Sequence, residues 1–250
     1  MMKKLITLTV MILVISGIFT SLQALTASEI LDKVDANMVA SSMKFSAELK
    51  ISISGSVRTK EFEGYSKGED KAYMEFTSPS RDKGTRFLKL ADEFWMYLPN
   101  VGKAVKIAGH AMRGSLMGSD FSYEDAVSNE ELANNYDAVL EGEEKVGDKN
   151  CYVLKLSLKE GAEGSYYTQK LWVDKSSFIF LKAEYYSRSG RLMKDVQILE
   201  WKRVSGKNYP TRIKMENKLR KNTWSEFVIT NIQLGVSIPA NVFTKGYLER

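Results

Sequence analysis

Apolar and polar residues repeat along this chain first with the period of a helix and then with the period of a strand. Residues 26–41 predict one amphipathic helix, with Ser28 as its N-cap, because their apolar positions recur at helical spacing. The residues at this spacing are Ile30, Leu31, Val34 and Met38. From residue 45 the period changes to two, which predicts half-buried strands.

The strand-like runs continue at close intervals and are separated by turn-forming residues. They lie at 45–53, 57–67, 71–77, 84–91, 93–98, 103–108, 136–146, 150–159, 166–174, 179–188, 191–203, 210–219 and 223–234. We expect eleven or twelve meandering strands in a single large antiparallel sheet, mainly β in class, that curls because of its length. The segment 238–248 is expected to be irregular.

The strand pattern fades between residues 109 and 135, where 123–127 and 129–134 predict short helical pieces. A curled sheet has a concave face that needs covering. The predicted N-terminal helix and this insertion are the available covers.

The segment 84–126 is rich in bulky apolar side chains, and Gly109, Gly114 and Gly118 interrupt its second half as candidate hinges. One interpretation is that the apolar residues of the insertion are ordinary core. The other is that the insertion docks reversibly, as a lid whose place an acyl chain can take. Flexible methionine side chains favour the second interpretation slightly, but the residues alone leave both open.

The first residues have the layout of a secretory signal peptide. Lys3 and Lys4 precede an apolar stretch at 5–19, which is shorter than the ~20 residues of a membrane-spanning helix. We expect cleavage after Ala24 and a mature chain, residues 25–250, that forms a single domain in the periplasm. An uncleaved anchor is the alternative.

Composition narrows the classes of partner and chemistry. The net charge of +5 falls to +3 without the two lysines of residues 1–24, and no arginine-rich run suggests nucleic-acid binding. Cys151 is the only cysteine, so it has no intramolecular disulfide partner, and its strand-like surroundings favour a small buried hydrophobe.

The inventory of catalytic residues argues against an enzyme. His110 is the only histidine, which nearly excludes a histidine-based triad or a multi-histidine metal site. The run 114–118 resembles a nucleophile elbow only superficially, because Ser115 occupies the wrong position in it. No phosphate-binding glycine motif is present. We therefore expect no metal and no cofactor.

Four motifs carry a resemblance to a known family: KGTRFL at 83–88, FWMYLP at 94–99, GSDFSYED at 118–125 and VFT at 242–244. With these motifs and its strand order the mature chain resembles the periplasmic outer membrane lipoprotein-sorting proteins of the LolA-like superfamily. It is most similar to the branch found beside RND-type membrane transporters. The resemblance implies an unclosed β-barrel of about eleven strands, plugged by helices, whose apolar cavity receives lipoprotein acyl chains.

The resemblance also implies a carrier function, with lipoprotein acyl chains or another lipid as cargo and an inner-membrane RND-type transporter as a candidate partner. We expect a monomer. In such carriers an arginine holds the empty form closed, and Arg86 is the candidate latch here. The candidate cavity and lid residues are Phe87, Trp95, Tyr97, Leu98, Met112, Leu116, Met117, Phe121 and Tyr123. A lipid sensor that regulates a membrane partner is the main alternative, and a purely structural envelope protein is the remaining one.

Overall fold

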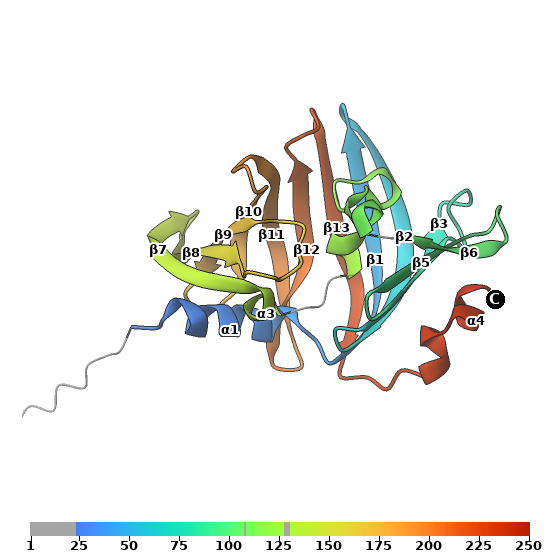
Figure 1. The fold of residues 1–250 in the computed structure, drawn as a ribbon, viewed down its shortest axis with the longest axis horizontal. Helices are drawn as coiled ribbons and strands as arrows, with labels where there is room; N and C mark the ends of the chain where they lie inside the picture. Colours follow the sequence, from blue (N-terminus) through green and yellow to red (C-terminus); the bar gives the residue numbers. More distant parts are fainter. Residues whose placement is uncertain (1–23, 108, 128–130) are drawn as a thin grey trace, which may run out of the picture.

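A computed structural model of the chain describes residues 24–107, 109–127 and 131–250. The expected signal peptide lies outside the described residues, apart from Ala24. The described chain forms one antiparallel sheet of thirteen strands that curls without closing into a barrel (Figure 1). The predicted fold class is confirmed, although the sheet has thirteen strands where eleven or twelve were expected. Each strand-like run of the sequence corresponds to one of the thirteen strands.

The first half of the sheet is a meander of consecutive hairpins that ends at one edge of the sheet. Its strands are β1 (Ser42–Ile53), β2 (Ser56–Lys67), β3 (Lys71–Ser78), β4 (Arg86–Leu90), β5 (Glu93–Leu98) and β6 (Lys103–Ile107).

The second half begins at the opposite edge and runs back toward the first. Its strands are β7 (Tyr136–Val146), β8 (Lys149–Leu158), β9 (Thr168–Asp174), β10 (Phe180–Tyr186), β11 (Leu192–Val204), β12 (Lys207–Asn217) and β13 (Thr223–Leu234). The last strand, β13, pairs with β1 along its length and joins the two halves.

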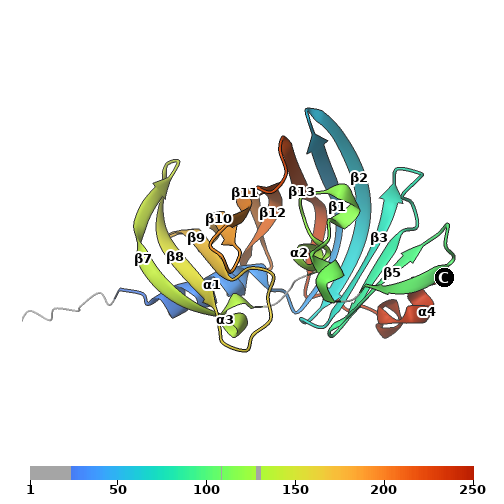
Figure 2. The same cartoon turned by 45° about the horizontal axis from the view of Figure 1, so that its top comes forward.

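This topology explains why the strand pattern is interrupted in the middle of the chain. The connection from β6 to β7 must travel from one edge of the sheet to the other, and it crosses the concave face (Figure 2). It contains η1 (Gly109–Arg113), η2 (Leu116–Gly118), α2 (Tyr123–Val127) and α3 (Leu132–Asn135). We call residues 109–127 the cover segment.

The N-terminal helix α1 (Ala27–Met38) covers the other part of the concave face, where it contacts β7, β12 and α3. The inward side of this helix carries its buried residues Ile30, Leu31 and Val34, as their spacing predicts. The predicted cap was wrong, because Ser28 lies inside the helix and Thr26 caps it. Glu29 N donates to the Thr26 hydroxyl, and Thr26 N donates to the Glu29 carboxylate at 2.8 Å, which satisfies two free N–H groups reciprocally.

The convex face of β2–β5 is covered by the C-terminal segment, which was expected to be irregular. It contains η3 (Ala240–Phe243) and α4 (Lys245–Leu248), which lie below the sheet in Figure 2. Val242, Phe243 and Leu248 pack there in a buried cluster with Tyr73 and Leu88. No helix in the described parts of the chain is long and apolar enough to cross a membrane.

Candidate functional site

The cover segment is attached to the concave face by apolar side chains. Leu116 is 1% exposed and belongs to the main core cluster, and Phe121 contacts the Phe227 ring of β13 at 6.2 Å between centroids. Tyr123 packs on Phe87 and Phe94 at 5.6 and 5.8 Å. The segment therefore shields the aromatic interior of the half-sheet from water.

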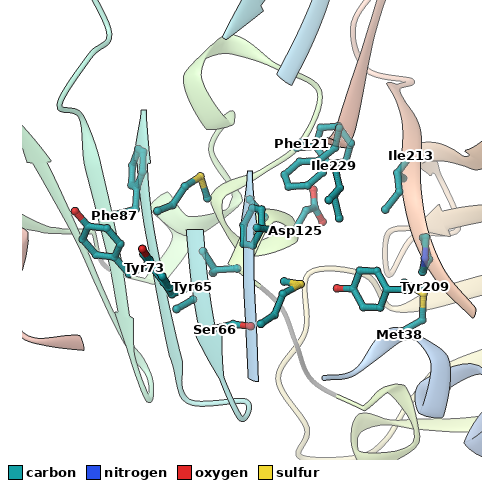
Figure 3. Close-up of a pocket in the computed structure, with 18 residues that line it drawn as sticks. Met38, Tyr65, Ser66, Tyr73, Phe87, Phe121, Asp125, Tyr209, Ile213 and Ile229 are labelled. Atoms are coloured by element: carbon teal, nitrogen blue, oxygen red, sulfur yellow. The ribbon is translucent and has the colours of Figure 1, made fainter. Parts of the chain in front are cut away.

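An apolar cavity of about 180 Å³ lies between the cover segment and the sheet, and we call it the main cavity (Figure 3). Its walls come from β1–β4, β12, β13, α1 and the cover segment. The lining residues are Met38, Met43, Phe45, Tyr65, Ser66, Ala72, Tyr73, Met74, Phe87, Phe121, Asp125, Ala126, Val127, Tyr209, Pro210, Ile213, Phe227 and Ile229. Asp125 is the only charged residue among them.

A second cavity, of about 240 Å³, lies beneath α1 and α3 on the β7–β12 side. It is more polar, and its lining includes the acidic residues Asp35, Glu124, Asp125, Glu131 and Glu163. The two cavities share Met38, Phe121, Asp125 and Ile213 as lining residues. These four side chains form a partition, two of them from the cover segment.

Asp120 ties the cover segment to the sheet through buried polar contacts. Its side chain is 0% exposed and accepts hydrogen bonds from the hydroxyls of Thr223 (2.8 Å) and Ser225 (2.9 Å) on β13. Arg220 lies 3.5 Å from the Asp120 carboxylate and donates to the backbone carbonyl of Ser119. Burial strengthens such bonds because water does not compete for the donors and acceptors.

Asp125 provides a second polar tie. Its carboxylate accepts a hydrogen bond from Tyr166 Oη at 2.9 Å and lies 3.8 Å from Lys194 Nζ. Lys194 also donates to the backbone carbonyl of Asp120. Burial lowers the pKa of the Lys194 ammonium, while the two aspartates oppose that shift. Burial, together with Asp125, raises the pKa of the Tyr166 hydroxyl, so it stays protonated as a donor.

The structure places the predicted cavity and lid residues at different depths. Phe87 and Phe121 line the main cavity, and Tyr123 packs behind Phe87. Leu116 is buried in the core, and Met112 and Met117 are partly buried against it. Leu98 is half-buried at the end of β5 and lines neither cavity.

Trp95 and Tyr97 lie on the opposite face of the sheet from the main cavity. They belong to the convex cluster with the C-terminal segment, whereas Phe94 and Met96 face the concave core. Successive side chains of a strand point to opposite faces, so a run in which every residue is apolar cannot all line one cavity. The cavity-lining prediction therefore does not hold for these two residues.

Arg86 also lies on the convex face, and in the described parts of the chain no hydrogen bond or ion pair joins it to the cover segment. Its guanidinium pairs with Glu75 at 3.1 Å, stacks on the Tyr97 ring at 5.2 Å and donates to the carbonyl of Leu248 at 3.1 Å. Arg86 thus holds the C-terminal segment. The expectation that it latches the lid is corrected by the structure, and Lys194 and Arg220 are the cations that bond the cover.

Sequence reasoning missed the contributions of β1, β2, β12 and β13 to the cavity wall. The inward positions of β1 could have been found from the alternating pattern, since Phe45 falls on the apolar phase of that strand. Both phases of β13 mix polar and apolar residues, so the pattern does not mark Phe227 as inward. Asp120 stands in the distinctive motif at 118–125, but only the fold reveals that the hydroxyls of β13 face it.

The arrangement offers apolar burial and hydrogen bonding but few groups suited to catalysis. His110 is exposed, and Cys151 is fully buried, with burial raising the pKa of its thiol. Among the residues that the structure describes, no cluster of three or more His, Cys, Asp or Glu side chains could hold a metal ion.

Comparisons with known proteins agree with this geometry. A family model described as "Uncharacterized protein" matches residues 68–250. No curated protein gives a significant match.

Among solved structures, a DUF1329 family protein from Desulfovibrio piger is similar to this chain, with 28% identity and a TM-score of 0.81. The alignment covers 89% of this chain and 97% of that one. A LolA superfamily protein from Nitrosomonas europaea has 26% identity and a TM-score of 0.76 over 90% and 100% of the two chains. A domain from Vibrio parahaemolyticus assigned as an outer membrane lipoprotein-sorting protein has 25% identity and a TM-score of 0.79 over 90% and 98%.

Proposed function

Because this chain belongs to the LolA superfamily, we propose that it is a periplasmic carrier of acyl chains. Its cargo is a lipoprotein or another lipid, held in the apolar cavity of the curled sheet for transfer toward the outer membrane. The carrier binds its cargo without catalysing a reaction, and a membrane transporter of the RND type is the proposed partner.

The observation that carries this proposal is the main cavity beneath a segment that only partly fills the concave face. Typical pockets for drug-sized ligands have volumes of about 300–1,000 Å³. Each cavity here is smaller, and a partition that includes Phe121 and Asp125 of the cover segment separates them. Displacement of the cover segment would join the two cavities and make room for an acyl chain.

The energetics favour exchange between the cover and a ligand. Burial of a methylene is worth about 0.8 kcal/mol, so a chain of ~16 carbons resists transfer to water by roughly 10 kcal/mol. The cover segment must leave with a similar free-energy cost, because a carrier has to release its cargo as well as bind it. Phe121, Leu116 and the methionines of the cover segment supply apolar contacts that an acyl chain can replace.

Native mass spectrometry of the protein purified from the periplasm tests the proposal. We expect a co-purifying acylated species that is lost in Ala126→Trp, a variant that fills the main cavity from the cover segment. Ala111→Trp is the matched control, because Ala111 is exposed in the same segment.

Incubation of the loaded protein with acceptor vesicles then tests transfer. A carrier releases the species to the vesicles, whereas a sensor of the same fold retains it. Absence of any acylated species from wild-type protein, or equal loading of Ala126→Trp and wild type, would contradict the proposal.

A further inference from the structure

The main cavity is apolar except for a few oxygen atoms, and most of these already have partners. The Tyr73 hydroxyl donates to Glu75, and the Asp125 carboxylate bonds to Tyr166 and lies beside Lys194. The Tyr65 side chain packs beside Tyr73 in the convex cluster, away from the cover segment. On the concave side, two hydroxyls remain among the lining side chains in the described chain, those of Ser66 on β2 and Tyr209 on β12.

The Ser66 hydroxyl is buried without a hydrogen-bond partner in the described structure. The residue is 5% exposed, and its oxygen is inaccessible to solvent. A buried hydroxyl without a partner destabilises the protein, which makes it an unusual feature of a native core. A ligand that supplies the missing hydrogen bond would give this serine a role.

Tyr209 contributes the second hydroxyl, and no hydrogen bond joins it to any residue that the structure describes. Figure 3 shows its hydroxyl directed toward the centre of the cavity, on the opposite side from Ser66. Burial raises the pKa of Tyr209 to about 12, so the hydroxyl is protonated and available as a donor at neutral pH.

The two hydroxyls are separated along the sheet, because β1 and β13 lie between β2 and β12. At about 4.8 Å per strand, their backbones are roughly 14 Å apart across the strands. A single oxygen atom would not serve both positions, whereas a head group with several oxygens can. Both residues belong to the sheet and remain in place when the cover segment moves.

The charge of the cavity restricts the head group further. The lining includes no lysine or arginine, and its only charged residue is the carboxylate of Asp125. A carboxylate or phosphate would enter a low-dielectric site without a cation in its lining, which disfavours binding. An uncharged group with hydroxyl or ester oxygens avoids this cost of burying an unpaired charge.

We propose that the main cavity binds a neutral lipid whose uncharged head group carries several hydroxyl or ester oxygens, and that Ser66 and Tyr209 hydrogen-bond to that group. The inference rests on the proposed carrier function and names the class of cargo. An acylglycerol has the required chemistry: an apolar chain, an ester and free hydroxyls.

Displacement of Nile red from the delipidated protein by three lipids of equal chain length tests this inference. The competitors are 1-monomyristoylglycerol, myristate and tetradecane. We expect the monoacylglycerol to compete at a concentration about a hundredfold lower than either of the others, about tenfold for each of the two buried hydrogen bonds. Ser66→Ala and Tyr209→Phe should each reduce this advantage about tenfold.

Thr211→Val is the matched control. The Thr211 hydroxyl is also buried without a partner, but Thr211 does not line the main cavity. Its replacement should leave the order of the three competitors unchanged. Equal competition by the three lipids, stronger competition by myristate, or an unchanged preference in both Ser66→Ala and Tyr209→Phe would overturn the inference but leave the carrier function standing. Failure of Nile red and of all three lipids to bind would overturn both.

Discussion

Asp120 of the cover segment and Ser225 of β13 form two hydrogen bonds with each other. Ser225 Oγ accepts from Asp120 N and donates to Asp120 Oδ2, each at 2.9 Å. Both residues are buried, at 1% and 0% exposure. This pair fixes the cover segment against the central strands at one defined position.

Replacement of Asp120 by alanine should therefore loosen the cover segment. The change leaves the hydroxyls of Ser225 and Thr223 without their acceptor, and loss of one partner from a buried hydrogen bond costs on the order of 1–3 kcal/mol. Urea denaturation measures the loss in free energy of unfolding. Hydrogen exchange should show faster exchange at residues 116–126 than in the strands.

Asp92→Ala is the control for that experiment, because Asp92 is exposed in the turn between β4 and β5. We expect its stability to stay within about 0.5 kcal/mol of wild type. Slow exchange at 116–126 in Asp120→Ala would contradict the role of Asp120 as a tie.

Phe121→Ala should raise the apparent affinity for an acyl chain while lowering stability. Phe121 separates the two cavities and packs on Phe227, so its loss enlarges the site and weakens the cover that competes with the ligand. Phe→Ala in a core costs about 3–5 kcal/mol. Ligand titration by fluorescence and urea denaturation measure the two effects separately.

Phe243→Ala distinguishes competition from general destabilisation. Phe243 is as buried as Phe121, at 6% and 5% exposure, but it packs on the convex face. Its replacement should lower stability similarly and leave the ligand affinity unchanged. An equal rise in affinity in both variants would show that loss of stability, and not release of the cover, controls binding.

The sequence allowed the sheet to be predicted more completely than the site. The alternation of apolar and polar residues marks each strand locally. The fading of this pattern after residue 108 located the connection from β6 to β7 that crosses the concave face. The motifs at 83–88, 94–99 and 118–125 led to the correct superfamily. The branch associated with RND-type transporters stays a prediction.

The sites of individual side chains were harder to predict because they depend on which face of the sheet each residue occupies. In the run Phe94–Leu98 every side chain is apolar, so no polar residue marks the phase of alternation. Arg86 was assigned to the cover for a similar reason. Its partners Glu75 and Leu248 are distant in sequence, and only the docking of the C-terminal segment brings them together.

The reassignment of Arg86 leads to a direct comparison with Lys194. Arg86→Gln should loosen the C-terminal segment, with faster hydrogen exchange at residues 240–250, a loss of about 1–3 kcal/mol and unchanged ligand affinity. Lys194→Met should instead raise ligand affinity, because Lys194 bonds to Asp120 and Asp125 of the cover segment. The reverse pattern of affinities would restore Arg86 as the latch.

Asp35 gives the protein a pH-dependent contact between α1 and α3. Its carboxylate is 3% exposed and accepts hydrogen bonds from the backbone N–H groups of Leu132 (3.0 Å) and Ala133 (2.9 Å). Burial raises the pKa of Asp35 from 3.8 to about 6, against the opposing effect of these two bonds. The folded protein therefore holds the Asp35 proton more tightly than the unfolded chain does.

A carboxyl whose pKa is raised by folding favours the folded state most when it is protonated. The contribution of Asp35 to the free energy of unfolding is complete below pH 3.8 and is lost as pH rises through about 6. The difference between these pKa values corresponds to about 3 kcal/mol. Asp35→Asn stays neutral at all pH values, so the stability of wild type relative to this variant should fall by up to that amount between pH 4 and pH 7.

Urea denaturation across this range measures the difference, since other titrating groups are common to both proteins. Asp92→Asn, at an exposed position in the turn between β4 and β5, should run parallel to wild type. A constant difference between wild type and Asp35→Asn over the range would show that Asp35 titrates normally and that the contact between α1 and α3 is independent of pH.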